Sequence, residues 1–210
     1  MFHLQGKIKL TSAGIKKDIP VDMGMKRALR ADARRNVDLV LTAAKDVFQA
    51  SGVDAPVRDI ASKAGVGMGT LYRHFPQRAD LIAAVFRKEV DACADAAGEL
   101  CEGHTPSECL TLWLQRYAAL IGTKRGLSAA LHSGDPAYSS LPDYFESRLL
   151  PALDTLSNAA IDAGEVRSDI DPRDLLGAVG CLGMRSGAGS AEQTERMVGL
   201  LVDGLRYRAE

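Results

Sequence analysis

Apolar residues recur every three to four positions through most of the chain, the spacing that lines one face of an α-helix. No segment shows the strict alternation of apolar and polar residues that is typical of a strand. A first helix is predicted over residues 29–50, where valine, leucine, alanine and Phe48 form a buried stripe that ends before Ser51-Gly52. Together these patterns predict an all-α protein with about nine helices and no sheet.

Capping sequences mark the start of three helices in the second half of the chain. Each begins with a side chain that can accept backbone hydrogen bonds, and two place proline at the first helical position, where its missing N–H is no loss. These sequences are TPSE at 105–108, DPRD at 171–174 and SAEQ at 190–193. Between them, residues 110–121 predict a buried helix and residues 142–163 a long one. Pro151 lies inside the long helix and is expected to kink or divide it.

Residues 56–75, PVRDIASKAGVGMGTLYRHF, predict two short helices joined by a turn at Gly65. In the second helix, Leu71 and Phe75 lie one turn apart on an inner face. The outer face then carries Met68, Thr70, Tyr72, Arg73 and His74. Such side chains supply phosphate contacts, base-edge donors and a methyl-sized probe, and a helix fits a major groove about 12 Å wide. The pattern indicates a DNA-binding helix-turn-helix; the alternative is an ordinary two-helix corner in an all-helical protein.

The stretch GVGMGTLYRHFPQRADL resembles the signature of the tetracycline-repressor (TetR) family of bacterial transcription regulators. The resemblance extends back through PVRDIASKAG and AAKDVFQASG and covers residues 34–86. It implies a three-helix, homeodomain-like head whose last helix enters the major groove, and a C-terminal helical domain that dimerises and binds a small effector. It also implies that a fourth helix, predicted to begin near Arg78, transmits the signal between the two domains.

The resemblance assigns roles to individual residues of the helix-turn-helix. It implies phosphate contacts from Tyr72, His74 and Arg78. It places four further residues towards bases or their flanking phosphates: Arg58, Met68, Thr70 and Arg73. The sequence departs from the family pattern at three positions. The family often has Thr or Ser where Pro56 stands, Ser where Gly67 stands and Lys where Arg78 stands. Gly67 and Gly69 are expected instead to let backbone N–H groups approach a phosphate closely.

Charge is distributed unevenly along the 210 residues, although the net charge is only −1. Residues 1–80 hold 14 basic and 8 acidic residues, and the remainder holds 12 basic and 19 acidic ones. A basic N-terminal part on an acidic body is typical of a protein that presents one end to a polyanion. We therefore predict a DNA-binding domain over residues 29–76 and an effector-binding and dimerisation domain over residues 77–210.

Residues 1–28 contain five lysines, three glycines and Pro20, without helical periodicity, and predict a disordered basic arm. The arm either enters the minor groove beside the main site, as homeodomain arms do, or is a solvated tail. Met23 and Met25 are alternative natural starts, in which case the residues before them are an upstream extension.

Other classes of site receive little support from the sequence. No apolar run is long enough to span a membrane, which predicts a cytoplasmic protein. Cys101, His104 and Cys109 suggest a metal or thiol sensor, but they offer no clear fourth ligand, so reduced core cysteines are the main interpretation. No catalytic, cofactor or metal motif is found, which leaves an enzyme or scaffold with a helix-turn-helix-like corner only as the alternative function.

The body contains candidates for a dimer interface and an effector pocket. Small residues that let helices approach closely, and an apolar stripe on the last helix, predict a four-helix interface between two copies, with intrachain packing as the alternative. The interface candidates are Gly177, Gly180, Gly183, Met197, Leu201 and Leu205. The effector pocket is expected to use large or polarisable side chains, each of which could also be plain core. The pocket candidates are Trp113, Tyr117, His132, Cys181 and Met184.

Overall fold

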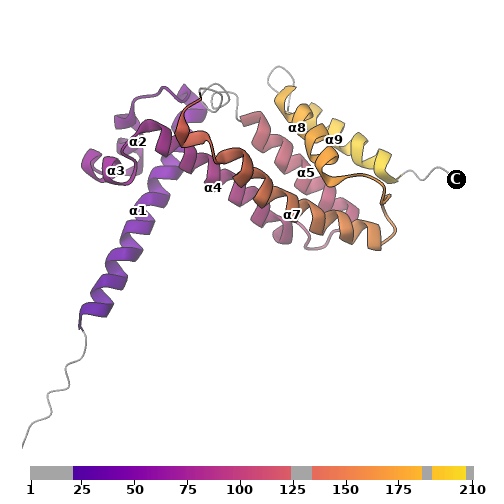
Figure 1. Ribbon diagram of the computed structural model, residues 1–210, viewed down its shortest axis with the longest axis horizontal. Helices are drawn as coiled ribbons and strands as arrows, with labels where there is room; N and C mark the ends of the chain where they lie inside the picture. Colours follow the sequence, from indigo (N-terminus) through magenta and orange to yellow (C-terminus); the bar gives the residue numbers. More distant parts are fainter. Residues whose placement is uncertain (1–20, 124–133, 186–190, 207–210) are drawn as a thin grey trace, which may run out of the picture. The chain divides into compact units, whose positions relative to one another are not determined.

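The computed structural model describes residues 21–123, 134–185 and 191–206, and their helices confirm the all-α prediction (Figure 1). No strand occurs in these ranges, and none of their helices is long and apolar enough to cross a membrane. The elements are α1 (Val21–Ser51), α2 (Val57–Ala64), α3 (Met68–His74), α4 (Arg78–Glu99), α5 (Pro106–Thr123), the 3-10 turn η1 (Pro136–Tyr138), α7 (Leu141–Asp162), α8 (Pro172–Arg185) and α9 (Ala191–Arg206). The chain forms two compact units, residues 1–35 and 36–210, and every site described below lies in the second.

Helix α1 begins at Val21, eight residues before the predicted start, so the prediction of a disordered segment was wrong for residues 21–28. The sequence MKRA at 25–28 consists of good helix formers. The lysines, Gly24 and the lack of an apolar stripe were therefore poor indicators of disorder in residues 21–28. The rest of the predicted arm, residues 1–20, lies outside the described residues.

A small core joins α1, α2, α3 and the first turns of α4 into one head. Ile60 and Leu71 are among its most deeply buried members, at 0% and 1% exposure. The buried residues of this core are Val40, Leu41, Ala43, Ala44, Ile60, Ala61, Leu71, Phe75, Leu81 and Val85. The inner face predicted for the helix-turn-helix is thus confirmed.

The turn between α2 and α3 depends on Gly65, which has the left-handed backbone angle φ of +67°. The Gly65 N–H donates to the Ser62 carbonyl at 3.2 Å, and the Val66 N–H donates to the Ala61 carbonyl at 3.0 Å. This pairing satisfies the last carbonyls of α2 and directs the chain into α3.

Replacing Gly65 with alanine should therefore lower the free energy of unfolding by about 1–2 kcal/mol, because a Cβ disfavours the left-handed conformation. Gly98 is the matched control, since it lies in α4 and an added Cβ would meet no atom within 4 Å. There the same substitution should raise stability by about 0.5 kcal/mol. Urea denaturation of both variants measures the difference, and equal effects at the two positions would contradict this account of the turn.

Helices α4, α5, α7, α8 and α9 enclose a larger core. Its centre is fully buried and includes Trp113, Leu114, Leu149, Leu153 and Val179. Capping fixes the helix starts: the Thr105 N–H donates to Glu108 at 2.8 Å, and the Arg173 N–H donates to Asp171 at 2.7 Å. These contacts confirm two predicted capping sequences.

Helix α7 runs through Pro151 as one continuous helix, so of the two expected effects, a kink or a division, the division does not occur. Proline removes only one backbone donor. The turns on either side are held by Leu149 and Leu153, which are both 0% exposed. Packing of this buried face maintains the helix across the missing bond.

Candidate functional site

The outer face of α3 presents a set of polar and large side chains that the fold leaves accessible. Tyr72 is 49% exposed and Met68 38% exposed, and Arg73 and His74 are also exposed, whereas Thr70 is half-buried. Leu71 and Phe75 point into the core and fix the orientation of the helix. The structure thus brings the predicted contact residues of α3 together on one short helix.

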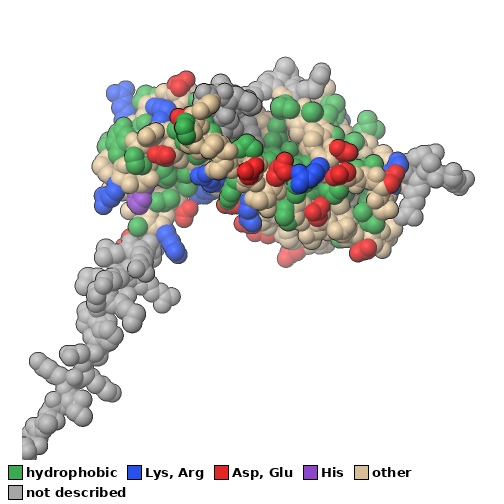
Figure 2. Space-filling view, in the orientation of Figure 1, with side chains coloured by type: hydrophobic (Ala, Val, Ile, Leu, Met, Phe, Trp, Pro, Cys, Tyr) green, Lys and Arg blue, Asp and Glu red, His purple; other side chains and the backbone are tan. Residues whose placement is uncertain are grey.

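Two arginines and two glycines extend this surface. The Arg58 side chain on α2 is 79% exposed, and its Nε lies 3.5 Å from Asp59. Arg73 donates a long hydrogen bond of 3.5 Å to the Thr70 hydroxyl. Gly67 and Gly69 are exposed, and a Cβ at either would meet no atom within 4 Å. Figure 2 shows Lys and Arg side chains around the part of the surface formed by α2 and α3.

Arg78 has a structural role that the sequence did not suggest. Its Nη1 donates to the carbonyl oxygens of Val53 and Ala55, the second at 2.9 Å, in the loop between α1 and α2. The side chain is half-buried, because it reaches back from the start of α4 to brace this loop. Arg78 thus holds the head together through Nη1, and its remaining N–H groups are left for the predicted phosphate contact, which stays a prediction.

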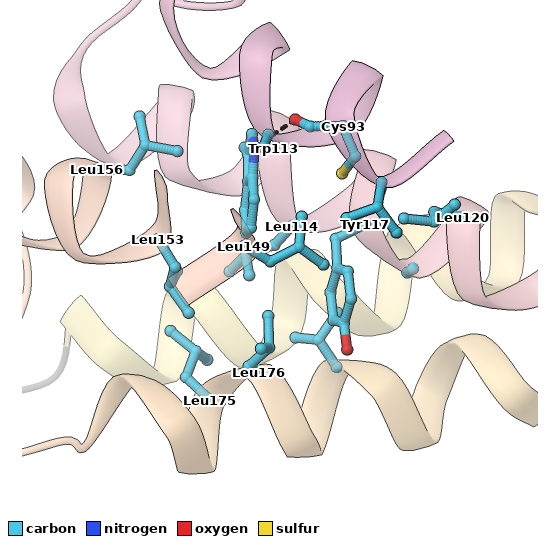
Figure 3. Close-up of a cluster of buried hydrophobic side chains, with 14 of the residues drawn as sticks. Cys93, Trp113, Leu114, Tyr117, Leu120, Leu149, Leu153, Leu156, Leu175 and Leu176 are labelled. Atoms are coloured by element: carbon cyan, nitrogen blue, oxygen red, sulfur yellow. Dashed lines mark hydrogen bonds between the residues drawn. The ribbon is translucent and has the colours of Figure 1, made fainter. Parts of the chain in front are cut away.

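The expected effector pocket is not where Trp113 lies. Trp113 is 0% exposed, its Nε1–H donates to the Cys93 carbonyl at 2.9 Å, and its ring stacks on Tyr117 at 6.0 Å (Figure 3). Trp113 is therefore core. Cys181 and Met184 are exposed on α8 and do not face the interior, which corrects their assignment to the pocket. His132 lies outside the described residues.

A cleft of about 270 Å³ does open between α5, α7 and α8. Its apolar lining includes Tyr117, Phe145 and Leu176, and burial raises the pKa of Tyr117 above its ordinary value. An ion pair borders the cleft, with Arg173 Nη1 2.6 Å from Glu146 Oε2. Of the predicted pocket residues that the structure describes, only Tyr117 lines it. The sequence carried no signal for the pair, because its members are 27 residues apart and meet only through the packing of α7 on α8.

The small residues of α8 divide into two groups. A Cβ on Gly183 would lie 2.6 Å from the Ala118 carbonyl oxygen, and one on Gly180 would lie 3.0 Å from the Tyr117 hydroxyl. Both glycines are buried against α5 of the same chain, so intrachain packing explains them and their assignment to a dimer interface is corrected. Gly177 is exposed and borders the cleft.

The apolar residues of α9 also face two ways. Leu205 is 9% exposed and belongs to the core, whereas Leu201 is half-buried and packs partly against the core, so its assignment to the interface stays a prediction. Met197 is 40% exposed and Leu200 75% exposed, and Met184 on α8 is 61% exposed. We call these three residues the α8–α9 apolar surface.

The cysteines do not form a metal site among the described residues, where no group of three suitable ligands occurs. Cys93 and Cys109 are buried. Burial, together with the neighbouring Cys101 thiol, raises the pKa of Cys109 to about 11. This thiol is therefore protonated at neutral pH and is a poor nucleophile.

Two family models match the chain in consecutive segments. Residues 40–85 match "Bacterial regulatory proteins, tetR family", and residues 105–207 match "Transcriptional regulator SbtR-like, C-terminal domain". The crystal structure of the TetR transcriptional regulator SCO0520 from Streptomyces coelicolor is 38% identical, covers 82% of this chain and 99% of that chain, and has a TM-score of 0.70. The chain belongs to the TetR family of bacterial transcriptional regulators.

Other TetR-family proteins support this placement. A TetR transcription regulatory protein from Mycobacterium vanbaalenii is 35% identical over 85% of this chain and 99% of that chain, with a TM-score of 0.69. The HTH-type transcriptional regulator SAR0097 from Staphylococcus aureus (strain MRSA252) is 41% identical over 68 residues, which are 31% of this chain. That match spans only about a third, 35%, of the curated relative. The family resemblance seen in residues 34–86 is thus confirmed, and it extends to the body.

Proposed function

We propose that this TetR-family protein is a non-enzymatic, DNA-binding transcriptional repressor that works without a cofactor in the cytoplasm and whose α3 enters the major groove of an operator. The observation that carries the proposal is the outer face of α3, where Tyr72, Arg73 and His74 are exposed around a buried Leu71. Tyr72 and His74 are assigned to phosphates, which position the protein. Arg58 and Arg73 are assigned to base edges, where arginine reads guanine. Met68, Thr70 and the backbone at Gly67 and Gly69 complete the contact set.

We further propose that two copies pair through the α8–α9 apolar surface. Large apolar side chains that are 40–75% exposed on two neighbouring helices favour a partner that covers them. A two-fold dimer presents two α3 helices to half-sites about one helical turn apart, so the operator should be palindromic.

The cleft between α5, α7 and α8 is the proposed effector site. Its aromatic and leucine lining, with one ion pair at the border, is typical of pockets for small and mainly apolar molecules. An effector releases DNA only if it binds one arrangement of the heads better than the other. DNA and effector must then oppose each other by a single coupling factor.

The assignment of residues to bases and to phosphates predicts two different effects of substitution on DNA affinity. Arg58→Ala should weaken operator binding by roughly 1–3 kcal/mol and relax the choice at one base pair, as loss of a guanine contact does. Tyr72→Phe and His74→Ala should weaken operator and unrelated DNA by similar factors, because phosphates carry no sequence information directly. Fluorescence anisotropy with DNA fragments that the protein selects from genomic DNA, titrated at two salt concentrations, measures both effects.

Arg196→Ala is the matched control, because this arginine is also highly exposed, at 69% of its side chain, but lies on α9. It should leave DNA affinity unchanged. If Arg58→Ala weakened binding to all DNA sequences equally, Arg58 would be assigned to the phosphate contacts instead. No DNA binding by the wild type at low salt would reject the proposal and leave the enzyme or scaffold alternative.

A further inference from the structure

We propose that Tyr144 and Arg148 are positioning residues for DNA binding, because they set the register of α4 on α7 and so the placement of the head on the body. This inference rests on the proposed DNA-binding function. It concerns two sets of polar side chains that face each other, which together we call the polar ladder. The α4 set is Arg87, Asp91 and Asp95, and the α7 set is Ser140, Tyr144 and Arg148.

The centre of the polar ladder is a shared carboxylate. Asp91 Oδ1 accepts a hydrogen bond from the Tyr144 hydroxyl at 2.7 Å and another from Arg148 Nε at 2.6 Å. Arg148 Nη2 also donates to Asp95 Oδ1 at 2.7 Å. One guanidinium thus spans two successive turns of α4, and its planar fork fixes the direction of both bonds.

The other end of the ladder is held by Arg87. Its Nη2 donates to the hydroxyl of Ser140, the N-cap residue of α7, at 3.0 Å. Its guanidinium carbon also lies 5.8 Å from the centre of the Tyr144 ring, which is within cation–π range. Tyr144 therefore contacts two turns of α4, as Arg148 does.

The spacing of the ladder specifies one register. Partners occur every four residues on both helices, and their residue numbers increase in the same order along the two helices. Helices α4 and α7 therefore run side by side in the same direction (Figure 1). A slip by one turn, about 5.4 Å, would place Asp91 beside Ser140 or beyond Arg148 and leave charged groups without their partners. Apolar packing alone specifies axial position less sharply. The ladder side chains are only partly buried, at 38–71% exposure for Asp91, Asp95 and Arg148, and so add little to overall stability.

The position of the ladder on α4 gives it influence over the head. Leu81 and Val85 at the start of α4 belong to the head core, and Val90 and Cys93 belong to the body core. Arg87, Asp91 and Asp95 follow directly after the head residues on the same helix. Because α4 is a continuous helix through both cores, its register on α7 fixes where the head stands.

The polar ladder and the proposed effector cleft lie on opposite sides of α7. Glu146 lines the cleft, and it leaves the helix about 200° around the axis from Tyr144, two residues earlier. Helix α7 is thus placed between the cleft and α4. Movement of α7 when the cleft is filled would reach the head through Tyr144 and Arg148.

The test compares operators that differ in half-site spacing. Arg148→Met keeps an unbranched apolar stem but removes the guanidinium group, with its charge and its donors. It should weaken binding to the operator selected by the wild type about five- to tenfold, the scale of coupling between sites, and flatten the preference among operators whose half-sites are moved apart or together by one base pair. Affinity for unrelated DNA should not change, because α3 itself is intact. Tyr144→Phe should act in the same direction but less.

The matched control is Arg167→Met, which removes a charge pair of similar exposure, with Arg167 2.5 Å from Asp169, away from α4. It should leave the spacing preference unchanged, and thermal melts should show all three variants folded. An unchanged spacing preference in a folded Arg148→Met protein would overturn the proposed role of the ladder but not the proposed DNA-binding function. Equal weakening on operator and unrelated DNA would do so as well. A wild type that binds no DNA would overturn the proposed function, and this inference with it.

Discussion

Replacing Trp113 with alanine is expected to lower the free energy of unfolding by about 3–5 kcal/mol, because it empties the centre of the body core. The indole is 0% exposed, stacks on Tyr117 and is surrounded by leucines of α5, α7 and α8 (Figure 3). The substitution also removes the Nε1–H donor of the hydrogen bond to the Cys93 carbonyl, which joins α5 to α4. Urea denaturation followed by circular dichroism measures the loss.

Two further variants separate the contributions to this loss. Trp113→Phe keeps an aromatic ring but not the Nε1–H donor, so it should cost less than alanine while still losing the hydrogen bond to the Cys93 carbonyl. Leu200→Ala truncates a side chain that is 75% exposed and should change the stability of the monomer by less than about 0.5 kcal/mol. If Trp113→Ala cost no more than Leu200→Ala, the indole would not be a core residue, and a ligand pocket around it would again be plausible.

Local features of the sequence predicted the head and most helix starts. The Gly65 turn, the capping sequence around Thr105 and the buried faces of α2 and α3 are each encoded within a few residues, so a single sequence is enough to read them. The contact set of α3 follows from the same periodicity, because burial of Leu71 and Phe75 leaves the other side chains outside. The early start of α1 was missed, since its first turns carry no capping signal and no apolar stripe.

Features that depend on which helix packs against which were not predictable in the same way. A run of small residues on α8 shows that some helix approaches closely, but not whether that helix belongs to the same chain or to a partner. At Gly180 and Gly183 the neighbour is α5. Arginine is likewise a typical phosphate-binding residue, but the Arg78 side chain donates hydrogen bonds to the loop carbonyls of Val53 and Ala55. The cleft and the polar ladder both depend on α7, whose neighbours are distant in sequence.

The two faces of α8 and α9 predict opposite outcomes for two substitutions. Gly183→Leu should destabilise the fold by about 3 kcal/mol or more, because even its Cβ would lie 2.6 Å from the backbone oxygen of Ala118 and 2.9 Å from Ile121 Cβ. Neither neighbour is the end of a flexible side chain. The loss should appear in the monomer itself, so urea midpoints should fall at every protein concentration.

Leu200→Glu should leave the fold intact and separate the proposed dimer. Leu200 is 75% exposed, so the free chain can hydrate a carboxylate there, but a carboxylate enclosed between two copies costs several kcal/mol. The dimer dissociation constant should rise at least about 100-fold, since each 1.4 kcal/mol is a factor of ten. Light scattering across a dilution series measures it, and operator affinity should fall with the loss of the second head. An unchanged dimer mass in Leu200→Glu, with the same melting temperature, would place the interface on another face of the body.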